Sequence, residues 1–243
     1  MHIIKLDAID STNSFLRDLK SHKQLKNFTV VVANQQLQGR GQMGTQWQSQ
    51  ASKNLTASIY AKVAFLKINH SFYISMATSL ALLKLLREFH LRPLFVKWPN
   101  DIMADNLKIA GILIENTIKN QKLESTIIGI GLNVNQTEFG NLPNASSLKL
   151  ITGIDYDLDH LLKRMVQHIE YEFARLERGE LEMVKKDYEA ELFRKEKPST
   201  FETVEGVRFS GFIKGVTHSG LLQIMLEDEL LKTFDLKEVK LLY

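Results

Sequence analysis

Three stretches of this sequence combine glycines with polar side chains that could bind an anion. The first is GRGQMG, residues 39–44, in which glycines would let backbone N–H groups approach a phosphate and Arg40 would make forked bonds to phosphate or carboxylate. The spacing also fits the dinucleotide-binding fingerprint, but that motif needs an acidic residue about 20 positions further on. No acid occurs here before Glu88, and the absence of HRD and DFG excludes a protein kinase. A phosphate-binding loop remains, with Trp47 at its end either stacking on a flat base or anchoring the core.

The second stretch is KWPNDIMADNLKIAGILIE, residues 97–115. Its Pro-Asn-Asp sequence predicts a turn directly after a strand, and Asn106 turns the chain into the next strand. The resulting hairpin-like pair would carry Lys97, Asp101 and Lys108 around one end. A lysine that opens an apolar strand is often a device that keeps an edge strand soluble. The functional alternative is a cation for a phosphate and a reacting carboxylate.

The third stretch is GIGLNVNQ, residues 129–136, where two glycines interrupt a strand. Glycine inside a strand lowers stability unless a ligand or another part of the backbone comes close. A β-bulge would explain the two glycines equally well. Asn133, at the end of this strand, carries an amide with both donors and an acceptor, which suits the edge of a base.

The charge of the chain is small overall but unevenly distributed. The formal net charge is +3, which is too low to indicate a nucleic-acid-binding protein. Between Asp18 and Glu88, however, there is no acidic residue, and such segregation favours an anionic ligand unless the basic side chains simply form a solvated face. The basic residues in this interval are Lys20, Lys23, Lys26, Arg40, Lys53, Lys62, Lys67, Lys84 and Arg87.

Several classes of protein are excluded or disfavoured by composition. The chain has no cysteine, so it can form no disulfide, zinc–thiolate site or cysteine nucleophile. Asp7 falls where a signal peptide would need its apolar core. The longest apolar run, from Phe72, reaches Lys84 before it is long enough to span a membrane. We therefore expect a cytoplasmic protein without a membrane partner.

Alternating and β-branched patterns predict the strands that position these stretches, and residues 35–52 form a long loop between two of them. A helix capped by Ser11 or Ser14 follows the first strand. Two longer helices are predicted over residues 72–90 and 157–178, and Gly179 suits the end of the second. The predicted strands are residues 3–9, 28–33, 55–65, 94–98, 109–118 and 126–134.

The residue pattern of the sequence changes from Pro198 onward. Short β-like runs at residues 207–212, 221–226 and 232–236 are separated by turn sequences. They predict a small all-β barrel of about 45 residues. A domain of this size is near the limit for independent folding, so we expect contacts with the larger domain to stabilise it. We expect a domain boundary between residues 195 and 196, giving domains 1–195 and 196–243.

Taken together, the motifs resemble those of the biotin–protein ligases, in the short form without an N-terminal DNA-binding domain. The family pattern is S-T-N, then Q-x-x-G-R-G-x-x-G-x-x-W, K-W-P-N-D, K-x-A-G-I-L-x-E and G-x-G-x-N. The chain carries these motifs in this order at residues 11–13, 36–47, 97–101, 108–115 and 129–133. The resemblance covers Ile3 to about Lys195 and extends more weakly to the C-terminal β segment. It implies an α+β fold with a mixed sheet flanked by helices, as in class II synthetases, followed by an SH3-like barrel.

The resemblance also implies a reaction and a set of site residues. Biotin would be activated by MgATP to biotinyl-5'-AMP and then transferred to a lysine of a biotin carboxyl carrier domain. Catalytic roles fall to Arg40 and Lys108, while Asp101 would either orient the incoming lysine or only fix its turn. Mg²⁺ would be held by phosphate oxygens and water, without a protein ligand. The implied biotin-binding residues are Ser11, Thr12, Asn13, Gln36, Gly39, Arg40, Gly41, Gln42, Lys108 and Gly111, and the implied ATP-binding residues are Arg40, Trp47, Lys97, Asn100, Lys108 and Asn133.

The sequence departs from the family in two respects. Gln42 and Thr45 stand where well-known bacterial members have arginines, so we expect this loop to hold the adenylate less firmly. Repressor-type members begin with a helix-turn-helix domain, whereas this sequence starts at the first catalytic strand, so we expect no DNA binding. The protein would be a monomer or a homodimer.

Two other functions fit these motifs less well. Lipoate–protein ligases and octanoyl transferases would show an arginine pair before a run of glycines and a later H-D, and neither feature is present. A module that only sequesters biotin or a carrier domain would not need Arg40, Lys108 and Asn133 together.

Overall fold

The β-branched and alternating runs form one mixed sheet of seven strands. The computed structural model describes residues 2–91 and 93–243. The strands lie in the order β1-β2-β3-β7-β6-β5-β4. β1 pairs with β2 in parallel, and the other neighbours are antiparallel. The strands are β1 (His2–Ile9), β2 (Thr29–Gln36), β3 (Leu55–Lys62), β4 (Leu94–Lys97), β5 (Asp101–Ala104), β6 (Leu107–Lys119) and β7 (Lys122–Leu132).

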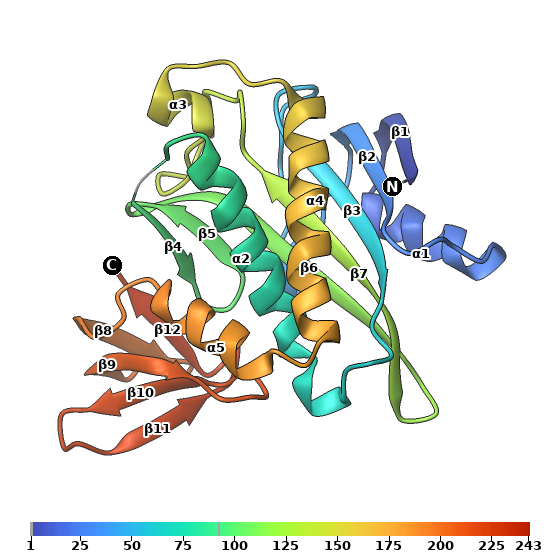
Figure 1. Ribbon diagram of the computed structural model, residues 1–243. Helices are drawn as coiled ribbons and strands as arrows, with labels where there is room; N and C mark the ends of the chain where they lie inside the picture. Colours follow the sequence, from blue (N-terminus) through green and yellow to red (C-terminus); the bar gives the residue numbers. More distant parts are fainter. Residues whose placement is uncertain (1, 92) are drawn as a thin grey trace.

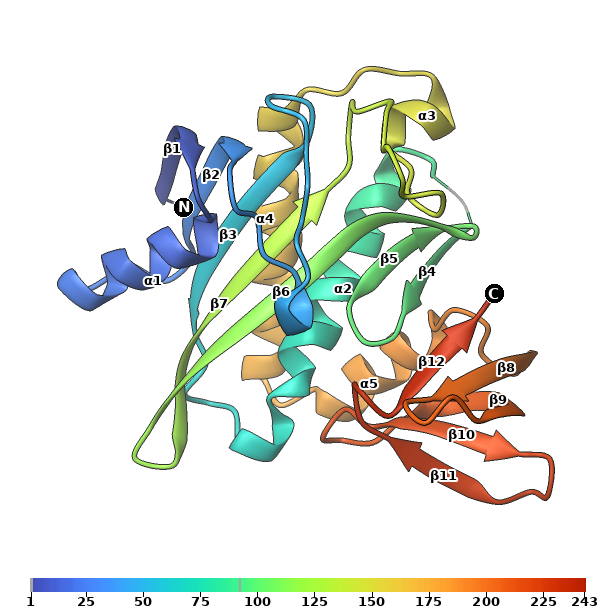
Figure 2. The ribbon, with the colours of Figure 1, turned by 180° about the vertical axis from the view of Figure 1, so that it is seen from behind.

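Successive residues of the central strands point to opposite faces of the sheet, and each face has its own core. On one face, Val30 and Ile59 belong to a large apolar core that α2 (Phe72–Glu88) and α4 (Leu158–Glu177) cover. On the other face, Val31 and Tyr60 pack against α1 (Thr12–His22). Figures 1 and 2 show the two long helices on one side of the sheet and the loop after β2 crossing the other side. The face with the loop is therefore open to a ligand.

A cluster of charged side chains joins the helices behind the sheet. Glu172 of α4 is completely buried, and its carboxylate accepts hydrogen bonds from Lys84 of α2 and, at 2.9 Å, from Arg175. Arg175 also bonds Glu180 at 3.1 Å and Asp187 of α5 (Leu181–Ala190) at 2.7 Å. Burial by itself lowers the pKa of Arg175, but the hydrogen bonds that it donates to these three carboxylates outweigh that effect and raise the pKa. The cluster thus connects the three helices to one another.

The C-terminal segment forms a second, antiparallel sheet in the order β11-β10-β9-β8-β12. Within the described residues, the edge strands β11 and β12 do not pair with each other, so the expected SH3-like strands are present without a hydrogen-bonded closure of the barrel. The strands are β8 (Pro198–Thr203), β9 (Arg208–Val216), β10 (Leu222–Leu226), β11 (Leu231–Phe234) and β12 (Val239–Leu242).

Several contacts fasten this second sheet to the larger unit, as expected for a small β domain. The indole Nε1 of Trp98 donates to the carbonyl of Gly220 at 2.9 Å, and the Tyr73 hydroxyl lies 2.7 Å from His218 Nδ1. Gly220 packs so closely on Phe72 that a Cβ there would lie 2.3 Å from the ring. The sheet begins at Pro198, and the boundary between residues 195 and 196 stays a prediction.

The predicted elements are confirmed, and several short ones were missed. Ser11 caps α1, which decides between the two predicted caps. The helix predicted to residue 90 ends at Glu88. The missed elements are β5, β8, β12, α5, α3 (Leu148–Thr152) and the 3-10 turns η1 (Gln42–Gly44) and η2 (Ile68–His70). Among residues 2–91 and 93–243, no helix has the length and apolar character needed to cross a bilayer.

Candidate functional site

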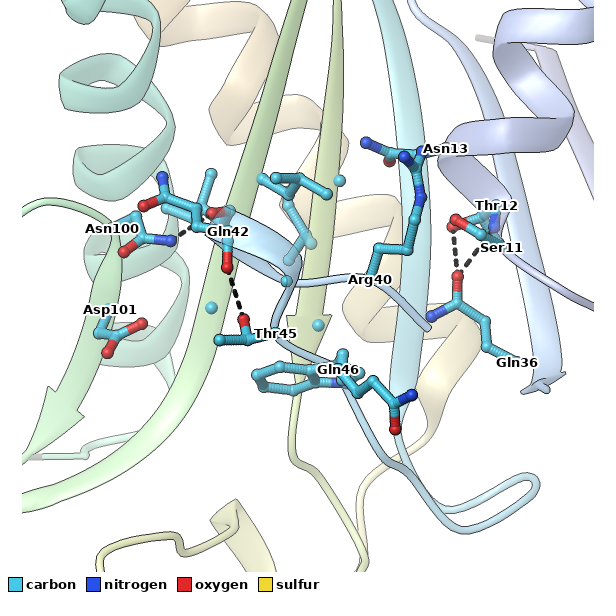
Figure 3. A pocket seen from close by; sticks show the side chains of 18 of the residues that line it. Ser11, Thr12, Asn13, Gln36, Arg40, Gln42, Thr45, Gln46, Asn100 and Asp101 are labelled. Atoms are coloured by element: carbon cyan, nitrogen blue, oxygen red, sulfur yellow. Dashed lines mark hydrogen bonds between the residues drawn. The ribbon is translucent and has the colours of Figure 1, made fainter. Parts of the chain in front are cut away.

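A cavity of about 320 Å³ opens beside α1 on the face of the sheet opposite the two long helices, beneath the loop that follows β2. Figure 3 shows Thr12 and Gln36 on one side of this pocket and Asn100 and Asp101 on the other, with the loop between them. Segments that are far apart in the sequence therefore meet at one place. The predicted site residues that line the pocket are Ser11, Thr12, Asn13, Gln36, Arg40, Gly41, Gln42, Trp47, Asn100, Asp101, Lys108 and Gly111.

Three predicted site residues are not among those that line the pocket. Gly39 lies at the base of the loop, against the backbone of Trp47. Lys97 faces Tyr243, with its Nζ 4.5 Å from the ring centroid and 3.3 Å from the hydroxyl. Asn133 is buried, and its amide donates to the carbonyl of Ser146 at 3.0 Å. Their predicted roles in binding stay predictions.

The glycines of the loop allow two parts of its own backbone to come close together. The loop folds back as a narrow hairpin, in which Gly41 N–H donates to the carbonyl of Thr45 at 2.7 Å and Trp47 N–H donates to Gly39 at 2.9 Å. A Cβ at Gly39 would lie 2.2 Å from the Trp47 carbonyl oxygen, and one at Gly41 would lie 2.4 Å from Thr45 Oγ1. Gly44 has a φ of +82°, which favours glycine. The glycines on either side of Arg40 thus let the two arms of the hairpin approach closely, with Arg40 opposite Gln46.

Trp47 lies flat on a floor made by two further glycines. Gly111 of β6 and Gly131 of β7 are register partners, and a Cβ at these positions would lie 2.9 Å and 2.2 Å from the indole. The only register shift between β6 and β7 lies at Thr117/Ile118, so a bulge does not explain Gly131. Gly131 is needed because the Trp47 side chain approaches the strand closely. From the sequence, a bulge or the approach of a ligand or of backbone had been the expected reasons. The indole Nε1 is buried and has no hydrogen-bond partner among the described residues.

The cation on the far side of the pocket is Lys108, paired with Asp101. Lys108 Nζ lies 2.7 Å from Asp101 Oδ1 and 5.6 Å from the centroid of the Trp47 ring. The turn before Asp101 is clipped to β6, because the Asn100 amide donates to the Ile112 carbonyl at 2.6 Å and Ile112 N–H donates back to Asn100 at 3.0 Å. The prediction of two paired strands around Lys97, Asp101 and Lys108 is only partly right, because β5 lies between β4 and β6 and pairs with both.

Neutral polar groups form the side of the pocket nearest α1. Gln36 Oε1 accepts hydrogen bonds from the Thr12 backbone N–H at 2.8 Å and from its hydroxyl at 3.0 Å. The buried Ser58 hydroxyl lies 2.7 Å from Thr12 Oγ1 and 2.5 Å from Asn13 Oδ1. A Cβ at Gly129 would lie 2.4 Å from that same Asn13 oxygen, which explains the other glycine of β7. These groups can recognise a neutral polar ligand through donors and acceptors.

Sequence reasoning missed several contributors to this site, among them Glu115 and Leu236. Glu115, the last residue of its motif, accepts hydrogen bonds from Arg40 Nη2 at 3.1 and 3.2 Å. Leu236, between β11 and β12, lines the pocket from the C-terminal sheet. Glu115 was visible as the acidic end of a motif, whereas no pattern in the sequence singled out Leu236.

Residues 6–133 match the Biotin/lipoate A/B protein ligase family, and the chain belongs to it. It is 31% identical over 135 residues to the bifunctional ligase/repressor BirA of Bacillus subtilis, an alignment that covers 56% of this chain and 41% of BirA. It is 28% identical over 172 residues to the biotin--[acetyl-CoA-carboxylase] ligase of Mycobacterium tuberculosis, covering 68% of this chain and 63% of that protein. The matched region thus spans less than two thirds of the length of these relatives.

Solved structures resemble the chain over nearly its whole length. The biotin protein ligase of Aquifex aeolicus, in complex with biotin and ATP, has a TM-score of 0.83 and 26% identity, covering 99% of this chain and 98% of that one. The biotin protein ligase of Leishmania major, in complex with biotinyl-5-AMP, has a TM-score of 0.66 at 20% identity and supports the fold alone.

Proposed function

We propose that this protein is a biotin–protein ligase, which activates biotin with ATP to biotinyl-5'-AMP and transfers it to a lysine of a biotin carboxyl carrier domain. The observation that carries the proposal is the pocket itself. Its lining combines two cations, Arg40 and Lys108, with the neutral polar groups of Thr12 and Gln36. The similarity to the Aquifex aeolicus ligase, which was solved with biotin and ATP, supports the same conclusion.

In the first step, an oxygen of the biotin carboxylate would attack the α-phosphorus of ATP. A bond between that oxygen and phosphorus forms, the bond from phosphorus to the bridging oxygen breaks, and pyrophosphate leaves with the bonding electrons. Negative charge gathers around the α-phosphate in the transition state. Arg40 and Lys108 would stabilise it electrostatically, while Asp101 holds Lys108 in place through the 2.7 Å ion pair.

In the second step, the neutral amine of a carrier lysine would attack the carbonyl carbon of the mixed anhydride. The new amide bond forms, AMP leaves as the carbon–oxygen bond breaks, and the amine loses a proton. Asp101, which lines the pocket, would help to orient the incoming lysine. This role is compatible with its pairing to Lys108, because a carboxylate can accept several hydrogen bonds.

The two substrates would occupy different parts of the pocket. Biotin's neutral ureido ring suits the side built by Ser11, Thr12, Asn13 and Gln36, where no cation is needed. The adenylate suits the side of Trp47 and Asn100, and the predicted ATP contacts of Lys97 and Asn133, which do not line the pocket, belong to the same proposal. ATP would enter with its Mg²⁺ held by phosphate oxygens and water. Among the described residues, no three His, Asp or Glu side chains gather as a metal site.

The acceptor protein and the cellular location of the reaction are part of the same proposal. The acceptor would be the biotin carboxyl carrier domain of a biotin-dependent carboxylase, and the reaction would take place in the cytoplasm, where ATP is available. A monomer or a homodimer, and the lack of DNA binding, stay predictions. Sedimentation and a mobility-shift assay would test them.

The decisive experiment is the exchange of labelled pyrophosphate into ATP. The proposal predicts exchange that depends on biotin, followed by transfer of biotin to a purified carrier domain. Lipoate and octanoate serve as matched controls and should support no exchange. Exchange with lipoate instead of biotin would reassign the substrate within the family, and binding of biotin without any exchange would leave only a sequestering module.

A further inference from the structure

Glu115 has no part in the reaction steps above, yet donors from two other segments meet at its carboxylate. Asn13 Nδ2 donates to Oε2 at 2.8 Å, and Arg17 Nη1 lies 3.4 Å from Oε1. Arg40 Nη2 sits between the two oxygens, at 3.1 and 3.2 Å. The Glu115 side chain is 25% exposed, so these bonds are partly shielded from water. The carboxylate thus connects β6 to α1 and to the loop.

The Arg40 side chain would lack a fixed direction without this contact. Its hairpin is held mainly by hydrogen bonds within the loop, and an arginine loses considerable rotamer freedom when it is fixed on a ligand. Glu115 removes that freedom in advance, and Figure 3 shows the Arg40 side chain reaching toward Asn13. Glu115 uses only Nη2, and the Nε and Nη1 of Arg40 have no hydrogen-bond partner among the described residues. These donors remain free for an anion.

The same carboxylate also reaches the polar side of the pocket. Asn13 links Glu115 to the Ser58 hydroxyl, which in turn contacts the Thr12 hydroxyl. The Thr12 backbone N–H donates to Gln36. Polar contacts therefore lead from the guanidinium of Arg40 through Glu115, Asn13, Ser58 and Thr12 to Gln36, and the single hydroxyl hydrogen of Ser58 is donated to one of its two neighbours at a time.

We propose that Glu115 is a positioning residue for adenylation, which holds the guanidinium of Arg40 where the charge of the α-phosphate develops. This inference rests on the function proposed above. Glu115 touches neither substrate and acts through Arg40. Misplacing a group that stabilises a transition state by about 1 Å can slow a reaction by up to about 100-fold, so a contact of this kind can matter although it is remote from the chemistry.

A double-mutant cycle on biotin-dependent pyrophosphate exchange tests the proposal. Glu115→Gln should lower kcat by about tenfold, with a smaller change in the KM for biotin. In an Arg40→Ala background, the same substitution should have no further effect, because the residue it positions is gone. A merely structural role for Glu115 would instead give losses that multiply.

Arg17→Ala is the matched control, because it removes another partner of the same carboxylate. Arg17 has a 59% exposed side chain, and its loss should change exchange by less than about twofold. If Glu115→Gln does not fold, Glu115→Asp keeps the charge but withdraws the carboxylate by one methylene and should show the same loss. Wild-type rates in the folded variants, or multiplying losses in the cycle, would overturn the inference. A wild-type protein without biotin-dependent exchange would overturn the proposed function instead.

Discussion

Two glutamates of this protein each gather basic side chains from distant segments, in opposite surroundings. Glu172 lies behind the sheet with its side chain completely buried, and its partner Arg175 is only 6% exposed. Glu115 lies beside Arg40 with 25% of its side chain exposed, and Arg40 is 38% exposed. Both carboxylates bridge elements that are remote in sequence, but only the second holds an arginine that lines the pocket and has donors left for a ligand.

The difference follows from solvation. Removing one member of a buried ion pair leaves the other charge without water or a partner, which costs about 3–5 kcal/mol. A partly exposed pair contributes about 1 kcal/mol or less, because water and salt compete with it. The Glu172 cluster is therefore structural, whereas the partly exposed pairs Arg40–Glu115 and Lys108–Asp101 can be removed without loss of the fold.

The largest effect should come from Glu172→Ala. The substitution removes the fully buried carboxylate, but Arg175 keeps Glu180 and Asp187 and Lys84 is partly exposed, so the free energy of unfolding should fall by about 3 kcal/mol, the lower end of that range, measured by urea denaturation. Lys5→Ala, which breaks an exposed pair between β1 and Asp159 of α4, is the control and should cost about 1 kcal/mol or less. Similar losses in the two variants would contradict the contrast.

Lys108→Ala should lower activity strongly and stability only slightly. Pyrophosphate exchange should fall by about 100- to 1,000-fold, since one of two cations at the developing charge is lost. The free energy of unfolding should change by about 1 kcal/mol or less, because the ion pair with Asp101 is partly exposed. Lys119→Ala, at the exposed end of β6, is the control for a lost positive charge. Retained exchange in Lys108→Ala would mean that Lys108 is not the central cation.

Gly131→Ala tests whether the pocket can change shape without unfolding. The new Cβ would lie 2.2 Å from the Trp47 indole and should push it off the glycine floor. We expect the emission of Trp47 to shift toward that of exposed tryptophan and ATP affinity to fall by about tenfold. The measurement is made in a Trp98→Phe background, since the chain has 2 tryptophans. Unchanged emission would show that Trp47 does not rest there in solution.

Gln42→Arg should have the smallest effect. It adds a cation to the pocket that has no carboxylate partner of its own, so its charge would be available to the adenylate. Because an exposed charge pair contributes up to about 1 kcal/mol, release of biotinyl-5'-AMP in a single-turnover chase should slow by up to about fivefold. Gln38→Arg places the same charge on an exposed position before the hairpin and should leave release unchanged. Unchanged or faster release in Gln42→Arg would refute the expectation.

Much of the fold was predictable because its signals are local. Strict alternation in β3 and helical spacing in α4 are read from neighbouring residues, and both elements were found. β5 was missed because Asp101–Ala104 is short and buries three consecutive residues, which gives no alternation. α5 was missed because only Val184 and Tyr188 are buried along it, so its apolar stripe is thin.

Some features of the site were likewise predictable from local sequence, whereas others depend on the fold. The residue types of the motifs indicated a phosphate loop and a lysine pair, and the structure brings most of them to one pocket. The contact between Arg40 and Glu115 joins positions 75 residues apart and depends on where the hairpin lies over β6, which no local pattern records. The resting place of Trp47 depends likewise on the register that sets Gly111 beside Gly131.

The position of Leu236 near the C-terminus affects the order in which the pocket forms during synthesis. A chain is synthesised from its N-terminus, and earlier parts fold before later ones are made. The motif residues all precede position 134, so they can assemble long before the C-terminal sheet exists. The wall that Leu236 provides is added only when that sheet docks, a step that takes milliseconds to minutes. A nascent or truncated chain would therefore hold its reactive groups in a pocket still open to water on one side.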